Sequence, residues 1–209
     1  MKLLLVAATE AEIAATLAYF NLKASRFIET DKFDVLITGV GMVATAFALG
    51  QKLHHNYSLV LNVGIAGSFY KEISLGELVN ITQDTFAELG AEDDEKFISL
   101  PQLGFGKNEF SSLANTKLTL RQVTGITVNK VHGNAHSIEK TIALYHPQTE
   151  SMEGAAVFYA CAELGIPALQ VRSISNYVET RNRENWQIAL AVKNLNNWLI
   201  GFLKTMNSK

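Results

Sequence analysis

The chain has 209 residues, of which 48% are apolar and 18% are charged, and its formal net charge is -2. This size and balance exclude a disordered chain and predict that residues 1–209 fold as a single domain with a sizeable core. The small charge gives no electrostatic reason to expect nucleic acid or an anionic membrane as a partner.

No apolar run reaches the roughly 20 residues that a membrane-spanning helix needs. The run Leu3–Ala8 is too short for a signal peptide and is followed directly by Glu10 and Glu12. A single cysteine, Cys161, cannot form an internal disulfide. The cytoplasm is therefore the expected compartment.

Short apolar runs alternate along the chain with segments of helical periodicity. The runs are typical of strands buried on both faces, and we predict strands at Lys2–Ala8, Phe33–Thr38, Leu59–Val63, Glu77–Gln83, Val123–Asn129 and Ala168–Ile174. Helices are predicted at Glu10–Tyr19, Met42–His54, Ser137–Tyr145, Gly154–Leu164 and Asn185–Met206. This alternation predicts an α/β fold with a central mixed, largely parallel sheet and helices on both faces. Phe86–Leu120 has few periodic signals, so it is a functional loop or contains short strands.

Ligands bind beyond the carboxyl ends of strands in open α/β sheets. Five motifs fall at such predicted ends: Thr9–Glu12, Thr38–Gly41, Asn62–Ser68, Ser151–Glu153 and Ser175–Asn176. Two of them are rich in glycine and are interpreted as turns whose N–H groups can approach a ligand, although tight turns need glycine in any case. Neither matches a phosphate loop or a full dinucleotide signature. Each motif is weak evidence alone, but together they predict one site.

Two carboxylates are candidates for chemistry. Thr9 and Glu12 have the spacing of a capping box, and Glu12 equally suits a general base that activates water. Glu153 begins a predicted helix, where an acid complements the helix dipole; alternatively it accepts hydrogen bonds from ribose hydroxyls while Met152 packs on the sugar. Glu150 is expected to be solvated. The residues alone leave these alternatives open.

The remaining polar residues give weaker signals. Asn176 is explained by turn chemistry as readily as by ligand binding, and Arg181 and Arg183 by a solvated loop. The histidines show no metal-ligand spacing, and no serine nucleophile elbow is present. We therefore expect neither a metal nor a serine hydrolase.

Taken in order, these segments resemble the nucleoside phosphorylase and nucleosidase superfamily, above all its hydrolase branch. That branch includes methylthioadenosine/S-adenosylhomocysteine nucleosidase and futalosine hydrolase. The most specific pieces are SMEGAA, at 151–156, and VRSISNYVETRNRENW, at 171–186. The resemblance covers almost the whole chain and is least secure over Phe86–Leu120.

The resemblance implies a site and a chemistry. Glu12 would activate water, and Asn176 would contact the purine edge during catalysis. The implied substrate-binding residues are Ala66, Gly67, Met152, Glu153, Ser175, Arg181, Arg183 and Trp186. The resemblance also implies a purine nucleoside as partner, no cofactor, and a homo-oligomer in which a neighbouring subunit helps to close the pocket.

Asn176 departs from the adenine-specific nucleosidases of the family, which carry an aspartate here. An amide offers one acceptor and one NH₂ donor, which matches a 6-oxopurine protonated at N7. The pattern therefore resembles that of the futalosine hydrolases, whose substrate carries hypoxanthine and whose reaction belongs to menaquinone biosynthesis. Arg181 or Arg183 would pair with the substrate carboxylate. An amide cannot donate the N7 proton, so a water relay would have to supply it.

Three alternatives remain. A purine nucleoside phosphorylase needs arginines for phosphate, and the chain has only Arg26 before Arg121. An adenine-type nucleosidase is disfavoured by Asn176. A non-catalytic nucleoside-binding protein would not need both Glu12 and Glu153.

Overall fold

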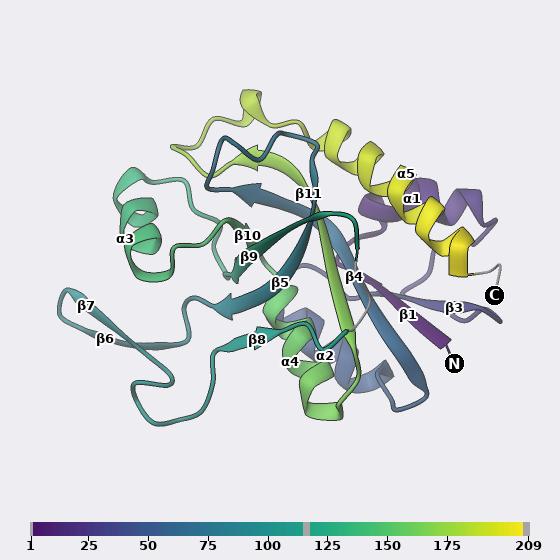
Figure 1. The fold of residues 1–209 in the computed structure, drawn as a ribbon, viewed down its shortest axis with the longest axis horizontal. Helices are drawn as coiled ribbons and strands as arrows, with labels where there is room; N and C mark the ends of the chain where they lie inside the picture. Colours follow the sequence, from purple (N-terminus) through teal and green to yellow (C-terminus); the bar gives the residue numbers. More distant parts are fainter. Residues whose placement is uncertain (1, 115–117, 207–209) are drawn as a thin grey trace.

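The computed structural model describes residues 2–114 and 118–206 (Figure 1). A nine-stranded sheet has the strand order β10-β9-β5-β11-β4-β1-β3-β2, with β8 paired to β5. Its strands are β1 (Lys2–Ala7), β2 (Phe27–Ile28), β3 (Phe33–Ile37), β4 (Tyr57–Ser68), β5 (Leu78–Phe86), β8 (Glu109–Ser111), β9 (Arg121–Thr127), β10 (Thr149–Ser151) and β11 (Ala168–Tyr177).

The sheet is mixed, and the expectation of a largely parallel sheet holds only for part of it. β1 runs parallel to β3 and β4, and β11 runs parallel to β4. β5 runs antiparallel to β11, and therefore also to β4, which is parallel to β11. Residues 69–77, which join β4 to β5, are too few for the crossover of a dozen or more residues that parallel strands need. β10 pairs with β9 in parallel and with β4 in the antiparallel direction, so this end of the sheet curls toward a barrel.

Helices cover both faces of the sheet, as predicted. The covering helices are α1 (Glu10–Tyr19), α2 (Met42–Lys52), α4 (Gly154–Leu164) and α5 (Ile188–Met206). Successive side chains of β1 point to opposite faces: Leu3 and Leu5 pack in the core cluster with residues of α1 and α5, whereas Leu4 and Val6 pack in the cluster with residues of α2 and α4. None of the helices within the described ranges is long and apolar enough to cross a membrane.

Most predicted helix bounds agree closely with the structure, and α1 and α4 agree at both ends. α5 begins at Ile188 rather than at Asn185, because Arg183–Asn185 forms a separate 3-10 turn, η1. α3 (Ala135–Tyr145) lies to one side of the sheet, near β9 and β10 (Figure 1).

Two segments differ from their predicted form. Asn62–Ser68 is not a turn, because it continues β4 and pairs with β11 as far as Ser68. Phe86–Leu120 contains three short strands, β6 (Gly90–Asp93), β7 (Lys96–Ser99) and β8, with residues 115–117 outside the described part. β6 and β7 form a hairpin that extends away from the sheet (Figure 1).

Candidate active site

A cavity of about 400 Å³ opens at the carboxyl ends of β1, β4, β10 and β11. Of the ten site residues that the sequence predicts, nine line it: Glu12, Ala66, Gly67, Met152, Glu153, Ser175, Asn176, Arg181 and Trp186. Arg183 is not among the lining residues. The structure therefore gathers both candidate carboxylates and the amide around a single space.

Glu12 lies in the first turn of α1, where three donors hold its carboxylate. Oε2 accepts the Thr9 backbone N–H at 3.0 Å and the Thr9 hydroxyl at 2.9 Å, and Oε1 accepts the Ile65 N–H at 3.1 Å. A carboxylate has about four lone-pair sites, so Oε1 can accept one more donor from the cavity. Capping the helix and binding a water are therefore compatible roles for Glu12.

The turn Thr38–Gly41 supplies a backbone donor to Glu153. Gly41 has a φ of 95°, which favours glycine, and donates its N–H to Glu153 Oε1 at 2.9 Å. Burial raises the pKa of the Glu153 carboxyl, Arg172 and the Gly41 N–H oppose that rise, and the Glu12 carboxylate adds to it. Glu12 and Glu153 thus lie close enough for their charges to interact.

Arg172, on β11, is 1% exposed and its charge acts on Glu153. Its Nη1 donates to Asn62 Oδ1 at 3.3 Å, while its Nε has no hydrogen-bond partner among the described residues. Gly64 brings the acid and the arginine together, because a Cβ there would lie 2.7 Å from Glu12 Oε1 and 3.3 Å from Arg172 Nη1. A buried cation in this position favours the ionised form of Glu153.

A further buried acid, Asp84, fixes the start of α4. It accepts the Thr127 hydroxyl at 2.9 Å and the Gln170 Nε2 at 2.7 Å. The Thr127 hydroxyl oxygen in turn accepts the Ala155 N–H at 2.7 Å, and burial raises the pKa of Asp84 to about 6. Because α4 begins directly after Glu153, this network positions the Glu153 carboxylate.

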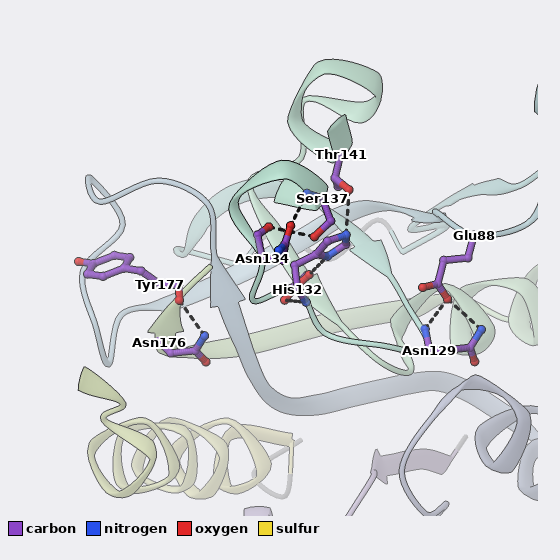
Figure 2. A network of polar contacts seen from close by, with 9 residues as sticks. Glu88, Asn129, His132, Asn134, Ser137, Thr141, Asn176 and Tyr177 are labelled. Carbon is purple, nitrogen blue, oxygen red and sulfur yellow. Dashed lines mark hydrogen bonds and ion pairs between the residues drawn. The ribbon is translucent and has the colours of Figure 1, made fainter. Parts of the chain in front are cut away.

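Asn176 lies at an irregularity in the pairing of β11 with β4. Its Nδ2 donates to the Tyr177 carbonyl at 3.0 Å (Figure 2), and its Oδ1 lies 2.8 Å from the Ser175 hydroxyl. An amide can make four hydrogen bonds. One donor and one acceptor of Asn176 therefore remain for a ligand.

The relationship of the chain to known proteins agrees with this geometry. The family model described as the phosphorylase superfamily matches residues 5–204. The chain belongs to this superfamily. A futalosine hydrolase of Streptomyces coelicolor is 33% identical over 176 residues, which are 78% of this chain and 74% of that protein. A futalosine hydrolase of Thermus thermophilus is 29% identical over 201 residues, or 89% of this chain and 85% of that one.

The fold is shared with solved structures of nucleosidases. A 5′-methylthioadenosine/S-adenosylhomocysteine nucleosidase from Helicobacter pylori superposes with a TM-score of 0.81 and 18% identity, covering 100% of this chain and 98% of that one. At this identity the likeness establishes the fold alone.

The expectation that Glu150 is solvated is wrong. Glu150 is 3% exposed, because β10 is paired on both sides. Its Oε1 accepts the His132 backbone N–H at 3.0 Å, and its Oε2 lies 2.6 Å from His132 Nδ1. Both residues line the cavity. Sequence reasoning missed this pair, and also Arg172, whose signal was a lone charge within the apolar run Ala168–Ile174.

The two arginines of the 181–183 loop differ in what they reach. Both stack on Trp186, with the guanidinium carbons of Arg181 and Arg183 at 5.1 and 5.7 Å from the ring centroid. Only Arg181 also lines the superfamily cavity. The geometry therefore favours Arg181 over Arg183 as a ligand contact.

Replacing Gly154 by alanine should lower the thermal stability of the protein. The added Cβ would overlap the buried side chains of Asp84 and Gln170, and overpacking of this kind costs about 1–3 kcal/mol. Thermal unfolding should show a clearly lower Tm for Gly154→Ala. Gly201→Ala in α5 is the control, since a Cβ there meets nothing within 4 Å. Equal Tm values for the two variants would contradict the proposed packing.

Proposed function

We propose that the protein hydrolyses the N-glycosidic bond of futalosine, releasing hypoxanthine and dehypoxanthine futalosine, as a step of menaquinone biosynthesis. The observation that carries the proposal is the presence of Glu12, Glu153 and Asn176 on the wall of one cavity. The relatives named futalosine hydrolase support the choice of substrate.

Glu12 is proposed as the general base. A water bound to its remaining Oε1 site lies over the cavity and attacks the anomeric carbon as the bond to the purine N9 breaks. Glu12 takes the proton of the water, the bonding electrons pass into the purine, and a relay of water molecules delivers a proton to N7. General base catalysis of this kind typically contributes about 10²–10⁴-fold to a rate.

Glu153 is proposed to hold the ribose. Its carboxylate accepts the vicinal hydroxyls, and Met152 packs against the sugar. Breaking the glycosidic bond leaves positive charge on the ribose, and two nearby carboxylates stabilise that charge more in the transition state than in the ground state. The Gly41 N–H, at 2.9 Å from Glu153 Oε1, keeps this carboxylate oriented.

The two ends of the nucleoside are assigned to separate groups. Asn176 faces the 6-oxopurine, with its oxygen toward N7–H and its NH₂ toward O6. Arg181 pairs with the carboxylate of the 5′ substituent, and Trp186 covers it. Arg181 is the only arginine among the lining residues within the described part of the chain, which disfavours a phosphate co-substrate.

We further propose a homo-oligomer that forms through the outer face of α2 and α4. This face exposes large apolar side chains, with Val43 at 78%, Phe47 at 60% and Tyr159 at 43%. Val40, which lines the cavity, is followed by Gly41, the N-cap of α2, so a second copy on this face would lie at the cavity mouth. Residues 1–209 are proposed to act as one domain in the cytoplasm.

The proposed reaction is tested by following release of free base from futalosine, inosine and methylthioadenosine, with and without phosphate. Hypoxanthine should appear from futalosine, and phosphate should not be required. A requirement for phosphate would indicate a phosphorylase, adenine release a nucleosidase of the methylthioadenosine type, and no release from any substrate a binding protein.

Glu12→Gln should abolish turnover while leaving the fold and ligand binding largely intact, with a loss in kcat of about 10²–10⁴-fold. Gly64→Ala should also lower kcat, because its Cβ would displace the Glu12 carboxylate from 2.7 Å away. Gly50→Ala is the matched control, since a Cβ there meets nothing within 4 Å. Circular dichroism monitors the fold; if Glu12→Gln unfolds, Glu12 serves chiefly as a helix cap.

Asn176→Asp should shift preference from 6-oxopurines toward 6-aminopurines. A protonated aspartate can donate to N7 while accepting from a 6-amino group, whereas the amide complements O6. The measurement is the ratio of kcat/KM for futalosine and for its 6-amino counterpart, in wild type and variant. An unchanged ratio would remove the proposed role of Asn176.

A further inference from the structure

The buried pair Glu150–His132 is part of the cavity wall but has no part in the reaction as proposed above. Glu150 Oε1 accepts the His132 backbone N–H at 3.0 Å, and Glu150 Oε2 lies 2.6 Å from His132 Nδ1. On the other side of the imidazole, Nε2 lies 2.8 Å from the Thr141 hydroxyl of α3 (Figure 2). Glu150 is 3% exposed. The carboxylate is therefore held in one orientation at the edge of the cavity.

Glu150 and Asn176 lie on either side of Gly67 in the sheet. Gly67 is the cross-strand partner of Glu150 on β10 and of Asn176 on β11. A Cβ at Gly67 would meet Val178 Cγ2 at 2.9 Å, Asn176 Nδ2 at 3.2 Å and Glu150 Cγ at 3.5 Å, so these side chains lie on the same face of the sheet. Two strand spacings separate β10 from β11, about 9.5 Å. The missing side chain of Gly67 makes room there for the apolar Val178 side chain beside the amide and the carboxylate.

The chemistry of a 6-oxopurine matches this pair of groups. N7, O6 and N1 lie in that order along one edge of the base, and N1 carries a proton in a 6-oxopurine but is an acceptor in a 6-aminopurine. An ionised carboxylate only accepts hydrogen bonds and has about four lone-pair sites. His132 uses two of these on Glu150, so further sites remain for N1–H.

We propose that Glu150, oriented by His132, accepts the N1–H of the 6-oxopurine and is a specificity-determining residue of the site. This inference rests on the proposed function. With Asn176 at N7 and O6, Glu150 would complete the recognition of one edge of the base. A 6-aminopurine would turn its N1 acceptor toward a buried carboxylate, and two facing acceptors leave both unpaired, which is costly.

The test is binding of free bases, which needs no turnover. Hypoxanthine, 1-methylhypoxanthine and adenine are titrated calorimetrically against wild type, Glu150→Gln and the control Glu139→Gln, an exposed acid of α3. Wild type and the control should bind hypoxanthine about 10- to 100-fold more tightly than either other base, as expected for a hydrogen bond to a charged group. In Glu150→Gln, affinity for hypoxanthine should fall by a similar factor, and its advantage over 1-methylhypoxanthine should largely disappear, whereas Asn176 should still disfavour adenine.

Two results would overturn the inference. The first is wild-type protein that binds hypoxanthine and 1-methylhypoxanthine equally, a result that does not depend on whether the variant folds. The second is a folded Glu150→Gln that prefers hypoxanthine to 1-methylhypoxanthine as strongly as wild type does. The proposed function fails separately. If wild type releases no hypoxanthine from futalosine, the reaction is wrong; if it does release hypoxanthine but ignores N1 methylation, only the role of Glu150 is wrong.

Discussion

The layout of the cavity depends on the charge that the buried Arg172 guanidinium places near the acids. Glu12 and Glu153 line the same space, and neighbouring like charges raise the free energy of the ionised pair. Arg172, 1% exposed, opposes that effect at Glu153 and lies against the backbone position that Glu12 contacts. A buried charge without partners is strongly destabilising. Removing Arg172 would therefore leave the burial of Glu153 and the repulsion from Glu12 without this opposing charge.

Glycines supply the second constraint, and they do so through space rather than conformational freedom. Gly64, Gly67 and Gly154 all lack a positive φ, so other residues could adopt their backbone conformations. Each is nevertheless crowded by other side chains: Glu12 at Gly64, Val178, Asn176 and Glu150 at Gly67, and the Asp84–Gln170 network at Gly154. Residues of the second glycine-rich motif line the cavity, although the motif forms a strand and not the predicted turn.

The features that the sequence predicted are those that local pattern determines. The apolar runs of β1, β3 and β11 and the bounds of α1 follow from burial and periodicity, and the convergence of motifs follows because parallel strands end at one edge. The direction of β5 and the pairing of β10 depend on contacts between distant segments. The burial of Glu150 was not predicted because the strand Thr149–Ser151 is too short to show a period and its pairing partners are distant in the sequence. Arg181 and Arg183 could not be separated before the turn η1 was known.

Glu12 shows why a helix cap can be part of an active site. The contacts with Thr9 occupy Oε2 at 3.0 and 2.9 Å and so fix the rotamer of the side chain before any substrate arrives. Oε1 is then directed toward the Ile65 N–H and the cavity. A base positioned in advance loses little freedom at the moment of reaction. The bond that stabilises the first turn of α1 is thus the same bond that orients the carboxylate, so the capping box and the proposed general base are one structural feature.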